Sequence, residues 1–409
     1  MINKLYGDGI HDDLPAIQEM LDSGAACVYL PMPQKNYTIT APIRINSNQE
    51  LKLDRYAKVC LAPGSDCVML TNSTPDKWNE NISVNGGIWD MNHKEQSPNP
   101  LHFSTVPNDG LKLGEYMNKI GYDRVTRQTL NAYTGMCFVF NSVRRLNFAN
   151  LTILNPVTFG ADFSYVEDFT IENIYFDYYD GSPKLWNMDG VHIEGFCKNG
   201  VIRNLHGACH DDMVAITADD FLHGPIENIL VDGLYSQNCH SAVRLLSYKS
   251  RVRNIHITNV FGTYYACGIV MSKYHESDDK SYFENITIDH IHASFCKGTV
   301  DVPGNRRPLI YIADNMDIKS LYLSHIFRDE THISLPTVGI MENTKIGILI
   351  AECVQQTNTV GKDAPFVENN GSIDNLVLNK IDVGTDSLIV NEGTIKNIVC
   401  ENIFSGKQN

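Results

Sequence analysis

LNFANLTI, at residues 146–153, consists of a short apolar run, an Asn and a second short run rich in β-branched residues. The pattern recurs at intervals of about 22 to 35 residues, which suits solenoid turns joined by loops of variable length. Short strands separated by Gly, Asn and Asp predict an all-β fold, a right-handed parallel β-helix. Further copies are FTIENI at 169–174, VRNIHITNV at 252–260, FENITI at 283–288, IDNLVL at 373–378 and IKNIV at 395–399.

The repeated Asn is expected to be structural. Asn tolerates the left-handed backbone of a tight turn and hydrogen-bonds to neighbouring backbone groups. A leucine-rich horseshoe is the alternative repeat fold. Its L-x-x-L-x-L spacing is absent, and almost no helical periodicity follows the strands. The β-helix is therefore the favoured architecture.

The N-terminal part of the chain differs from the repeats. DDLPAIQEMLD, at residues 12–22, contains an acidic start, an early Pro and apolar residues at helical spacing. We expect a short amphipathic helix there that covers the open end of the β-helix. Asp12 and Asp13 are predicted to be its caps.

The chain is expected to be one β-helix domain over residues 1–409. Within it we distinguish a cap region at 1–60, an inserted loop at 91–135 and regular coils at 140–405. The inserted loop contains several Pro residues and little strand alternation. A loop of this length is rarely idle in a compact fold, so we expect it to close one end of a groove. A disordered surface excursion is the alternative.

Composition narrows the class of protein. With 43% hydrophobic and 20% charged residues the chain resembles an ordinary soluble protein, and no apolar run is long enough to span a membrane. A net charge of −15 repels nucleic acid and anionic membranes. Eleven cysteines without any CxxC argue against a disulfide framework or zinc module. Residues 1–5 lack the apolar region of a signal peptide, which favours the cytoplasm; a signal removed beforehand is the alternative.

Acidic residues gather in one part of the sequence: Asp189, Asp211, Asp212, Asp219 and Asp220. Asp189 precedes Asp211 by 22 residues, about one turn, which predicts adjacent rungs roughly 4.8 Å apart. Carboxylates this close cannot all ionise cheaply, so one should have a raised pKa. Acid–base hydrolysis of a glycosidic bond needs such an arrangement. A solvated Asp-rich turn and a calcium site are the alternatives.

These residues resemble those of glycoside hydrolase family 28, the polygalacturonase-like β-helices. Residues 7–31 are similar to the cap region of pectinase-type β-helices. The triplet of Asn187, Met188 and Asp189 resembles the family's Asn-Thr-Asp, and the Asp pair that begins at Asp211 resembles its Asp-Asp. The general pattern covers most of the chain, whereas the diagnostic residues lie within about 187–273.

The resemblance implies a role for each carboxylate. Asp211 would protonate the leaving oxygen, while Asp189 and Asp212 activate water on the opposite side and invert the anomeric centre. Inversion needs carboxyl groups about 6.5–9.5 Å apart. No metal or organic cofactor is needed for this chemistry. Asp219 and Asp220 follow a strand, where capping of turn backbone is the simpler interpretation, with Asp220 also a candidate for binding sugar hydroxyls.

Histidines near the acids are further candidates. His240, between Cys and Ser, is the nearest match to the family's Gly-His-Gly turn, and His223 followed by Gly is a second. His240 is expected to tune the acid or to hold a sugar hydroxyl, with a structural donor as the alternative. His210 directly precedes the Asp pair and is the better site neighbour. Strand alternation places His192 on the face opposite Asp189.

The family's Arg-Ile-Lys strand holds a uronate carboxylate. VRLL at 243–246 retains Arg244 without the Lys, and VMSK at 270–273 places Lys273 one position late. A clamp with half its charge favours a neutral or singly charged sugar, although both side chains could simply face solvent. Trp186 precedes the Asp189 rung and is expected to stack on a sugar ring, with core packing as the alternative.

The sequence thus predicts a glycoside hydrolase that acts on an oligosaccharide or pectin-like glycan, with inversion. The closed groove and the expected cytoplasmic home favour exo attack. Its partner would be an oligosaccharide or polysaccharide rather than nucleic acid or membrane, and both a monomer and a homo-oligomer such as a trimer are compatible. A polysaccharide lyase or epimerase, and a non-catalytic tailspike-like carbohydrate-binding β-helix, are alternatives on the same fold.

Overall fold

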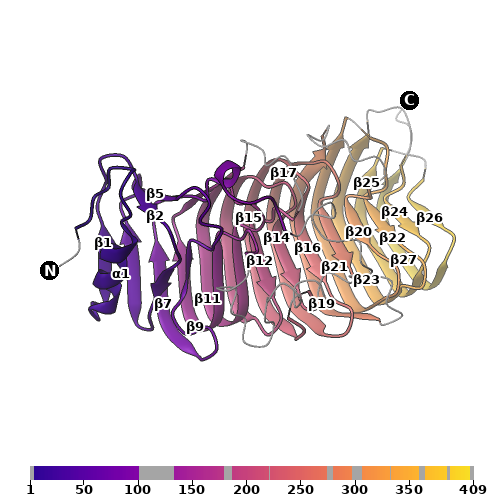
Figure 1. Ribbon diagram of the computed structural model, residues 1–409. Helices are drawn as coiled ribbons and strands as arrows, with labels where there is room; N and C mark the ends of the chain where they lie inside the picture. The colour runs from indigo at the N-terminus through magenta and orange to yellow at the C-terminus, as the bar shows by residue number, and fades with distance from the viewer. Residues whose placement is uncertain are drawn as a thin grey trace. The chain divides into compact units, whose positions relative to one another are not determined.

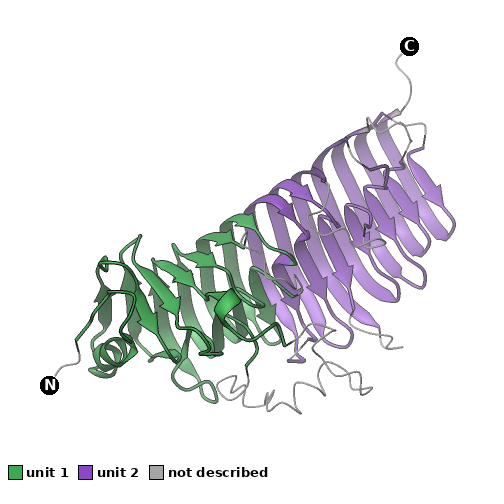
Figure 2. Ribbon diagram, turned by 45° about the horizontal axis from the view of Figure 1, so that its top comes forward, with its two compact units in different colours: residues 1–211 green, residues 212–409 purple. Residues whose placement is uncertain are grey.

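A computed structural model describes residues 4–100, 133–178, 187–220, 222–273, 280–296, 306–331, 333–358, 364–384 and 387–405. The chain divides into two compact units, residues 1–211 and 212–409 (Figure 2). Trp186 lies outside the described residues, as does the part of the expected inserted loop from 101 to 132. The expectation of a single domain remains a prediction.

The first unit contains one α-helix, one 3-10 helix and thirteen strands among its described residues (Figure 1). In chain order they are α1 (Leu14–Asp22), β1 (Cys27–Leu30), β2 (Tyr37–Ile39), β3 (Ile43–Ile45), β4 (Gln49–Leu53), β5 (Lys58–Leu61), β6 (Leu70–Asn72), β7 (Asn79–Asn85), β8 (Ile88–Asp90), η1 (His93–Glu95), β9 (Phe138–Ala149), β10 (Thr152–Leu154), β11 (Ala161–Asp177), β12 (Val191–Glu194) and β13 (Lys198–Ala208).

The described part of the second unit contains strands and no helix. They are β14 (Asp212–Thr217), β15 (Ile226–Cys239), β16 (Ser241–Leu246), β17 (Arg251–Tyr264), β18 (Ile269–Ser272), β19 (Ser281–Phe295), β20 (Ile310–Ile312), β21 (Met316–Glu330), β22 (Val338–Ile340), β23 (Lys345–Asn358), β24 (Val367–Asn369), β25 (Ser372–Val383), β26 (Ile389–Asn391) and β27 (Thr394–Ser405).

Within each unit the strands pair in parallel with the strand one turn further along the chain. In the first unit β11 pairs with β13, and in the second β19 pairs with β21. Ser372 faces Thr394, 22 residues later, and Ser281 faces Met316, 35 residues later. Both offsets fall within the repeat spacing expected from the sequence. The parallel β-helix prediction is confirmed.

The repeated Asn residues have the left-handed backbone predicted for them, but they lie inside the long strands β11, β17 and β19 rather than in separate turns. Asn173, Asn254 and Asn285 have φ angles of 57°, 54° and 55°, in the left-handed region that Asn tolerates better than most residues. Their side chains also form ladders between turns. Asn285 Nδ2 donates to Asn254 Oδ1 at 2.9 Å, and Asn254 Nδ2 donates to Asn228 Oδ1 at 2.8 Å. An amide both donates and accepts, so a stack of Asn residues satisfies itself.

The N-terminal helix is present where the sequence predicted it, but its acids act differently from expectation. Asp13 is the N-cap residue, yet its side chain makes no capping bond within α1. Its carboxylate instead accepts the backbone N–H groups of Gly7 and Thr38, and so fastens neighbouring segments to the helix start. Asp12 Oδ1 accepts the N–H of Leu14 at 3.0 Å. The prediction that Asp12 and Asp13 cap the helix is confirmed in position, since Asp13 is the N-cap residue and Asp12 bonds to Leu14, but the Asp13 side chain bonds outside α1.

Apolar side chains at equivalent positions of successive turns stack to form the core. In the second unit one column is aliphatic, and each member contributes about 1.5–3 kcal/mol through burial. Its members are Ile229, Ile255, Ile286, Leu321, Leu349 and Leu376. The first unit has an aromatic core in which Phe148 meets Phe138 and Phe163 edge to face, with ring centroids 5.0 and 5.3 Å apart.

Two further sequence expectations concern cysteines and membrane spans. All eleven cysteines are free, as expected from their scattered spacing. Among the described residues, no helix combines the length and the apolar character that crossing a membrane requires.

Candidate functional site

Asp189 lies in the first unit, just before β12, and contacts His192. Asp189 Oδ2 and His192 Nδ1 are 2.6 Å apart, and only 4% and 2% of the two residues' surfaces are exposed. The sequence prediction that these two residues face opposite sides was wrong. Alternation holds within a regular strand, but β12 begins at Val191, so Asp189 belongs to the preceding turn.

Two carboxylates that the sequence reasoning missed complete a buried cluster around His192. Asp162 on β11 is in register with His192 on β12, and Glu194 Oε1 lies 4.0 Å from His192 Nε2. Phe159 stacks on the imidazole with ring centroids 4.2 Å apart. The sequence signal for this cluster was that polar residues occupy alternate positions in β11 and again in β12, 30 residues later. Only the register of the two strands shows that these positions lie side by side.

This buried cluster has the donor set of a metal centre. Asp162, His192 and Glu194 each offer a ligand atom, and these atoms lie within 4.8 Å of one another. A hydrogen bond from His192 Nδ1–H to Asp189 would fix the ring tautomer. The lone pair on Nε2, which lies near Glu194, would then be available to a metal ion. The group can therefore bind a cation or hold a proton shared among carboxylates.

His210 and Asn187 also belong to the first unit. His210 Nε2 is 3.0 Å from the backbone oxygen of Tyr178, so the ring donates from that nitrogen. Burial lowers the pKa of His210, and nearby His93 lowers it further, against the effect of the Tyr178 carbonyl. The ring is thus a neutral, oriented donor at pH 7. Asn187 is buried, with a left-handed backbone at φ 56°.

In the second unit Asp212 opens β14 and joins side chains from the neighbouring turn. Ser241, in register with it on β16, donates its hydroxyl to Asp212 Oδ1. Arg244 Nε lies 2.6 Å from Asp212 Oδ2, and His240 Nδ1 lies 3.9 Å from Oδ1. Three of the predicted site residues therefore come together in this unit.

The surroundings of Asp212 keep its carboxylate ionised. Burial by itself would raise the pKa, but the Arg244 guanidinium, His240 and Ser241 outweigh it and lower the pKa to about 2. Asp212 exposes only 2% of its surface, whereas the side chains of His240 and Arg244 expose 21% and 25%. At neutral pH Asp212 is a fixed anion that orients two accessible groups, and it cannot act as a proton donor.

Asp219 forms a turn cap, which matches the simpler sequence interpretation. Its Oδ2 accepts the backbone N–H groups of Tyr248, Lys249 and Ser250 at 2.7–2.9 Å. Burial raises the pKa of Asp219, but these bonds and His223 lower it to about 2. The carboxylate is thereby committed to the backbone of the next turn.

Two more predicted residues lie beside rather than within the Asp212 group. Lys273 directly follows β18 and pairs with Asp314, Nζ to Oδ2 at 3.7 Å. Val270 on the same strand is in register with Arg244, which places Lys273 three positions further along. Asp220 is partly exposed at the turn after β14. Sugar binding by Lys273 and Asp220 stays a prediction.

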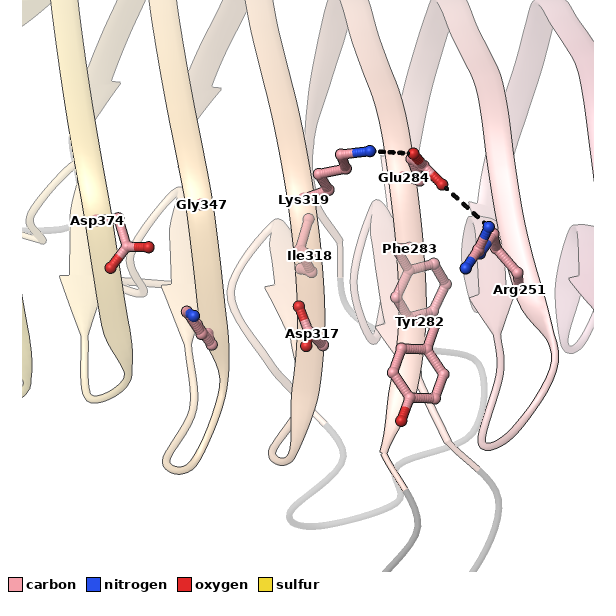
Figure 3. Close-up of a pocket in the computed structure, with 10 residues that line it drawn as sticks. Arg251, Tyr282, Phe283, Glu284, Asp317, Ile318, Lys319, Gly347 and Asp374 are labelled. Atoms are coloured by element: carbon pink, nitrogen blue, oxygen red, sulfur yellow. Dashed lines mark hydrogen bonds and ion pairs between the residues drawn. The ribbon is translucent and has the colours of Figure 1, made fainter.

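A hollow of about 350 Å³ on the second unit involves none of the predicted site residues (Figure 3). Its charged side chains balance in number, with Arg251, Lys319 and Lys345 against Glu284, Asp317 and Asp374, and Lys319 and Arg251 both pair with Glu284. These mutual ion pairs give the hollow no preferred sign of ligand charge. We therefore do not assign it as the active site.

Comparisons with known proteins support the fold. No protein-family model matches the sequence, and no curated protein is similar to it. The structure resembles a family 28 exopolygalacturonase of Yersinia enterocolitica, with TM-score 0.55, 13% identity and coverage of 97% of this chain and 76% of that one. For the Azotobacter vinelandii mannuronan C-5 epimerase AlgE6 A-module the values are 0.58, 11%, 98% and 97%.

A third similar structure is the tailspike protein of E. coli bacteriophage HK620 in complex with a pentasaccharide. It has TM-score 0.63 and 10% identity, with coverage of 97% of this chain and 77% of that one. Identities this low establish a shared parallel β-helix and nothing finer. The resemblance to family 28 is thus a relationship of fold.

Proposed function

We propose that the protein hydrolyses a glycosidic bond in an oligosaccharide or pectin-like glycan by carboxylate acid–base catalysis. The observation that carries the proposal is Asp212, a buried carboxylate kept ionised by Arg244. Asp211, the residue directly before Asp212 in the chain, is partly exposed. Glycosidases need carboxyl groups held in different protonation states, and unequal environments are how proteins create that difference. The similar structures support a glycan as the substrate, because an exopolygalacturonase and a tailspike with bound pentasaccharide are among them.

The roles are those implied by the sequence. Asp211 donates the proton to the leaving oxygen, and the carboxylates of Asp189 and Asp212 serve as bases for water, so the product anomer is inverted. Asp189 Oδ2 lies 2.6 Å from His192 Nδ1, and this contact orients the carboxylate. Arg244 and His240, oriented by Asp212, bind substrate hydroxyl or carboxylate oxygens. The proposal includes exo attack, that is, cleavage at the end of the glycan chain.

The decisive experiment is a reducing-sugar assay over a panel of α- and β-linked oligosaccharides, both neutral and uronate-containing. Asp211→Asn should lower kcat/KM by about 10²- to 10⁴-fold, the usual contribution of a general acid. Asp168→Asn is the matched control. Asp168 is exposed and has φ 56°, which Asn tolerates, and the new amide can still accept from Asn199. Equal turnover by both variants would rule the mechanism out.

A lyase or C-5 epimerase on the same fold is the second candidate, favoured by the similarity to the AlgE6 module over nearly its whole length. A lyase would release unsaturated products that absorb in the ultraviolet, without net addition of water. An epimerase would change the sugar composition of a polymer without shortening it. Glycan binding without turnover, unaffected by Asp211→Asn, would indicate the tailspike-like binding protein.

A further inference from the structure

The second unit contains a column of residues with left-handed backbone, one from each of six successive long strands, made of two Asn, two His, one Cys and one Lys. Each member lies inside one of the strands β17, β19, β21, β23, β25 and β27 and has a φ angle of 49–55°. Asn is the residue best suited to this backbone among ordinary side chains, although His also tolerates it. The members in chain order are Asn259, His290, His325, Cys353, Lys380 and Asn402.

The Asn members of this column follow a simple bonding rule. Asn259 Nδ2 donates to Asp232 Oδ1, on the turn before it, at 2.7 Å. Asn402 Nδ2 donates to Asn379 Oδ1, also on the preceding turn, at 2.9 Å. An Asn at this position therefore donates one bond to an acceptor on the preceding turn.

His325 obeys this rule, and His290 does not. His325 Nδ1 lies 2.9 Å from Asp289 Oδ1, one turn earlier. His290 would by the same rule reach back to Thr258, but its Nδ1 lies 2.5 Å from Asp289 Oδ2 within its own turn. The two rings stack with centroids 4.4 Å apart. The bonding pattern of the Asn residues accounts for the contact of His325 with Asp289, but it does not account for the contact of His290 with the same carboxylate.

We propose that Asp289, His290 and His325 form a binding site for a divalent transition-metal ion of the zinc class. The three ligand atoms lie within 4.8 Å of one another. Two imidazole nitrogens and one carboxylate select zinc, cobalt, nickel or copper over calcium and magnesium, which prefer oxygen. The site is separate from the proposed hydrolytic residues, none of which belongs to it.

Only a small adjustment separates the structure from metal-binding geometry. Ligand atoms about 2.05 Å from a tetrahedral zinc ion are about 3.3 Å from each other. The present separations of 2.5 and 2.9 Å between carboxylate oxygens and Nδ1 atoms must widen by about 0.4 to 0.8 Å. The His side chains are 46% and 41% exposed, so their rings can turn and water can complete the coordination.

The surrounding groups favour a cation at this position. The Ser324 hydroxyl donates to Asp289 and orients the carboxylate, as the second shell of a metal site does. Glu352, in register with Ser324 on the next turn, is a further carboxylate two turns from Asp289, and it accepts the Tyr322 hydroxyl. On binding, each imidazole moves its proton from Nδ1 to Nε2, so that Nδ1 offers its lone pair.

The test is titration of the full-length, chelator-treated protein with CoCl₂, read by equilibrium dialysis and by visible absorption. His290→Asn combined with His325→Asn is the informative variant, because Asn already occupies this turn position at Asn259 and Asn402. Wild type should bind one more equivalent of Co²⁺ than the double variant. Each single variant should bind it at least about 10-fold more weakly. The eleven thiols are unchanged throughout, so their background binding cancels.

Two controls keep the result interpretable. His256→Asn removes an exposed His from β17 and should leave Co²⁺ binding unchanged. Asp289→Asn keeps both rings and should also weaken binding, which covers the case in which the double variant folds poorly. Equal Co²⁺ stoichiometry and affinity in wild type and the double variant would overturn the proposal. So would a lost equivalent whose spectrum shows thiolate-to-cobalt charge transfer, because the ligands would then be cysteines.

Discussion

Replacing Arg244 with Met should destabilise the second unit through the carboxylate that the guanidinium now neutralises. Asp212 is buried, and its Oδ2 lies 2.6 Å from Arg244 Nε. Two unit charges about 4 Å apart attract by about 4 kcal/mol at an effective dielectric constant near 20. Removal of one partner from a buried pair costs about 3–5 kcal/mol. Because a quarter of the Arg244 side chain is exposed, we expect a loss of about 3 kcal/mol at pH 7.

The pH dependence gives this prediction its sign. In the wild type the pKa of Asp212 is lowered to about 2 from an ordinary value of 3.8. Its ionised form therefore contributes stability above pH 3.8, and that contribution is lost as the pH falls toward 2. Without Arg244 the largest contribution that opposes burial is lost, so the pKa of Asp212 rises from its wild-type value. The difference in unfolding free energy between wild type and Arg244→Met should then be largest at pH 7 and shrink toward pH 3.

Equilibrium urea unfolding, followed by far-ultraviolet circular dichroism at pH 7 and pH 4, measures the effect. The double variant Asp212→Asn with Arg244→Met should recover at least about 2 kcal/mol of the loss, because no buried charge remains. A loss below about 1 kcal/mol for Arg244→Met, or the same loss at both pH values, would refute the assignment of an ionised, Arg-dependent Asp212.

Three further changes test the fold. Asp219→Ala leaves the backbone N–H groups of turn 248–250 without their acceptor and should cost about 3 kcal/mol, with faster hydrogen exchange confined to that turn. Gly262→Ala should cost about 3 kcal/mol or more in urea unfolding, because φ is +128° and a Cβ would lie 2.0 Å from the carbonyl oxygen of Ser236; wild-type stability would show that the backbone there adapts. Phe148→Ala should lower the unfolding free energy by about 3–5 kcal/mol by emptying the aromatic core of the first unit, and a loss under 1 kcal/mol would mean that the core collapses to fill the space.

Local chemistry made several features predictable from the sequence. A left-handed backbone position needs a residue that accepts positive φ, so this conformation of Asn173, Asn254 and Asn285 could be predicted from residue type and repeat position alone. The Pro and the apolar spacing of residues 14–22 likewise indicated α1. Asp219 was predicted to cap a turn for the same reason. In each case the determining interactions lie within a few residues or repeat at every turn.

Contacts between turns could not be predicted from the sequence, because they depend on the register of the paired strands. The sequence offered Arg244 as a substrate ligand, but only the pairing of β14 with β16 places its guanidinium on Asp212. Strand alternation failed at His192, since the position where β12 begins decides which face a residue takes. Asp162 carries no local signal, because only the register of β11 with β12 brings it to His192.

The sequence by itself determined the architecture, because a repeated pattern of β-branched residues and Asn has one economical way to bury its apolar side chains. Only the tertiary structure decided which acids are charged and what they hold. The pKa of a carboxylate depends on burial and on partners about 30 residues away in the chain, as it does for Asp212 with Arg244 and for Asp219 with Ser250. Loop lengths set those pairings turn by turn, and no local pattern encodes them.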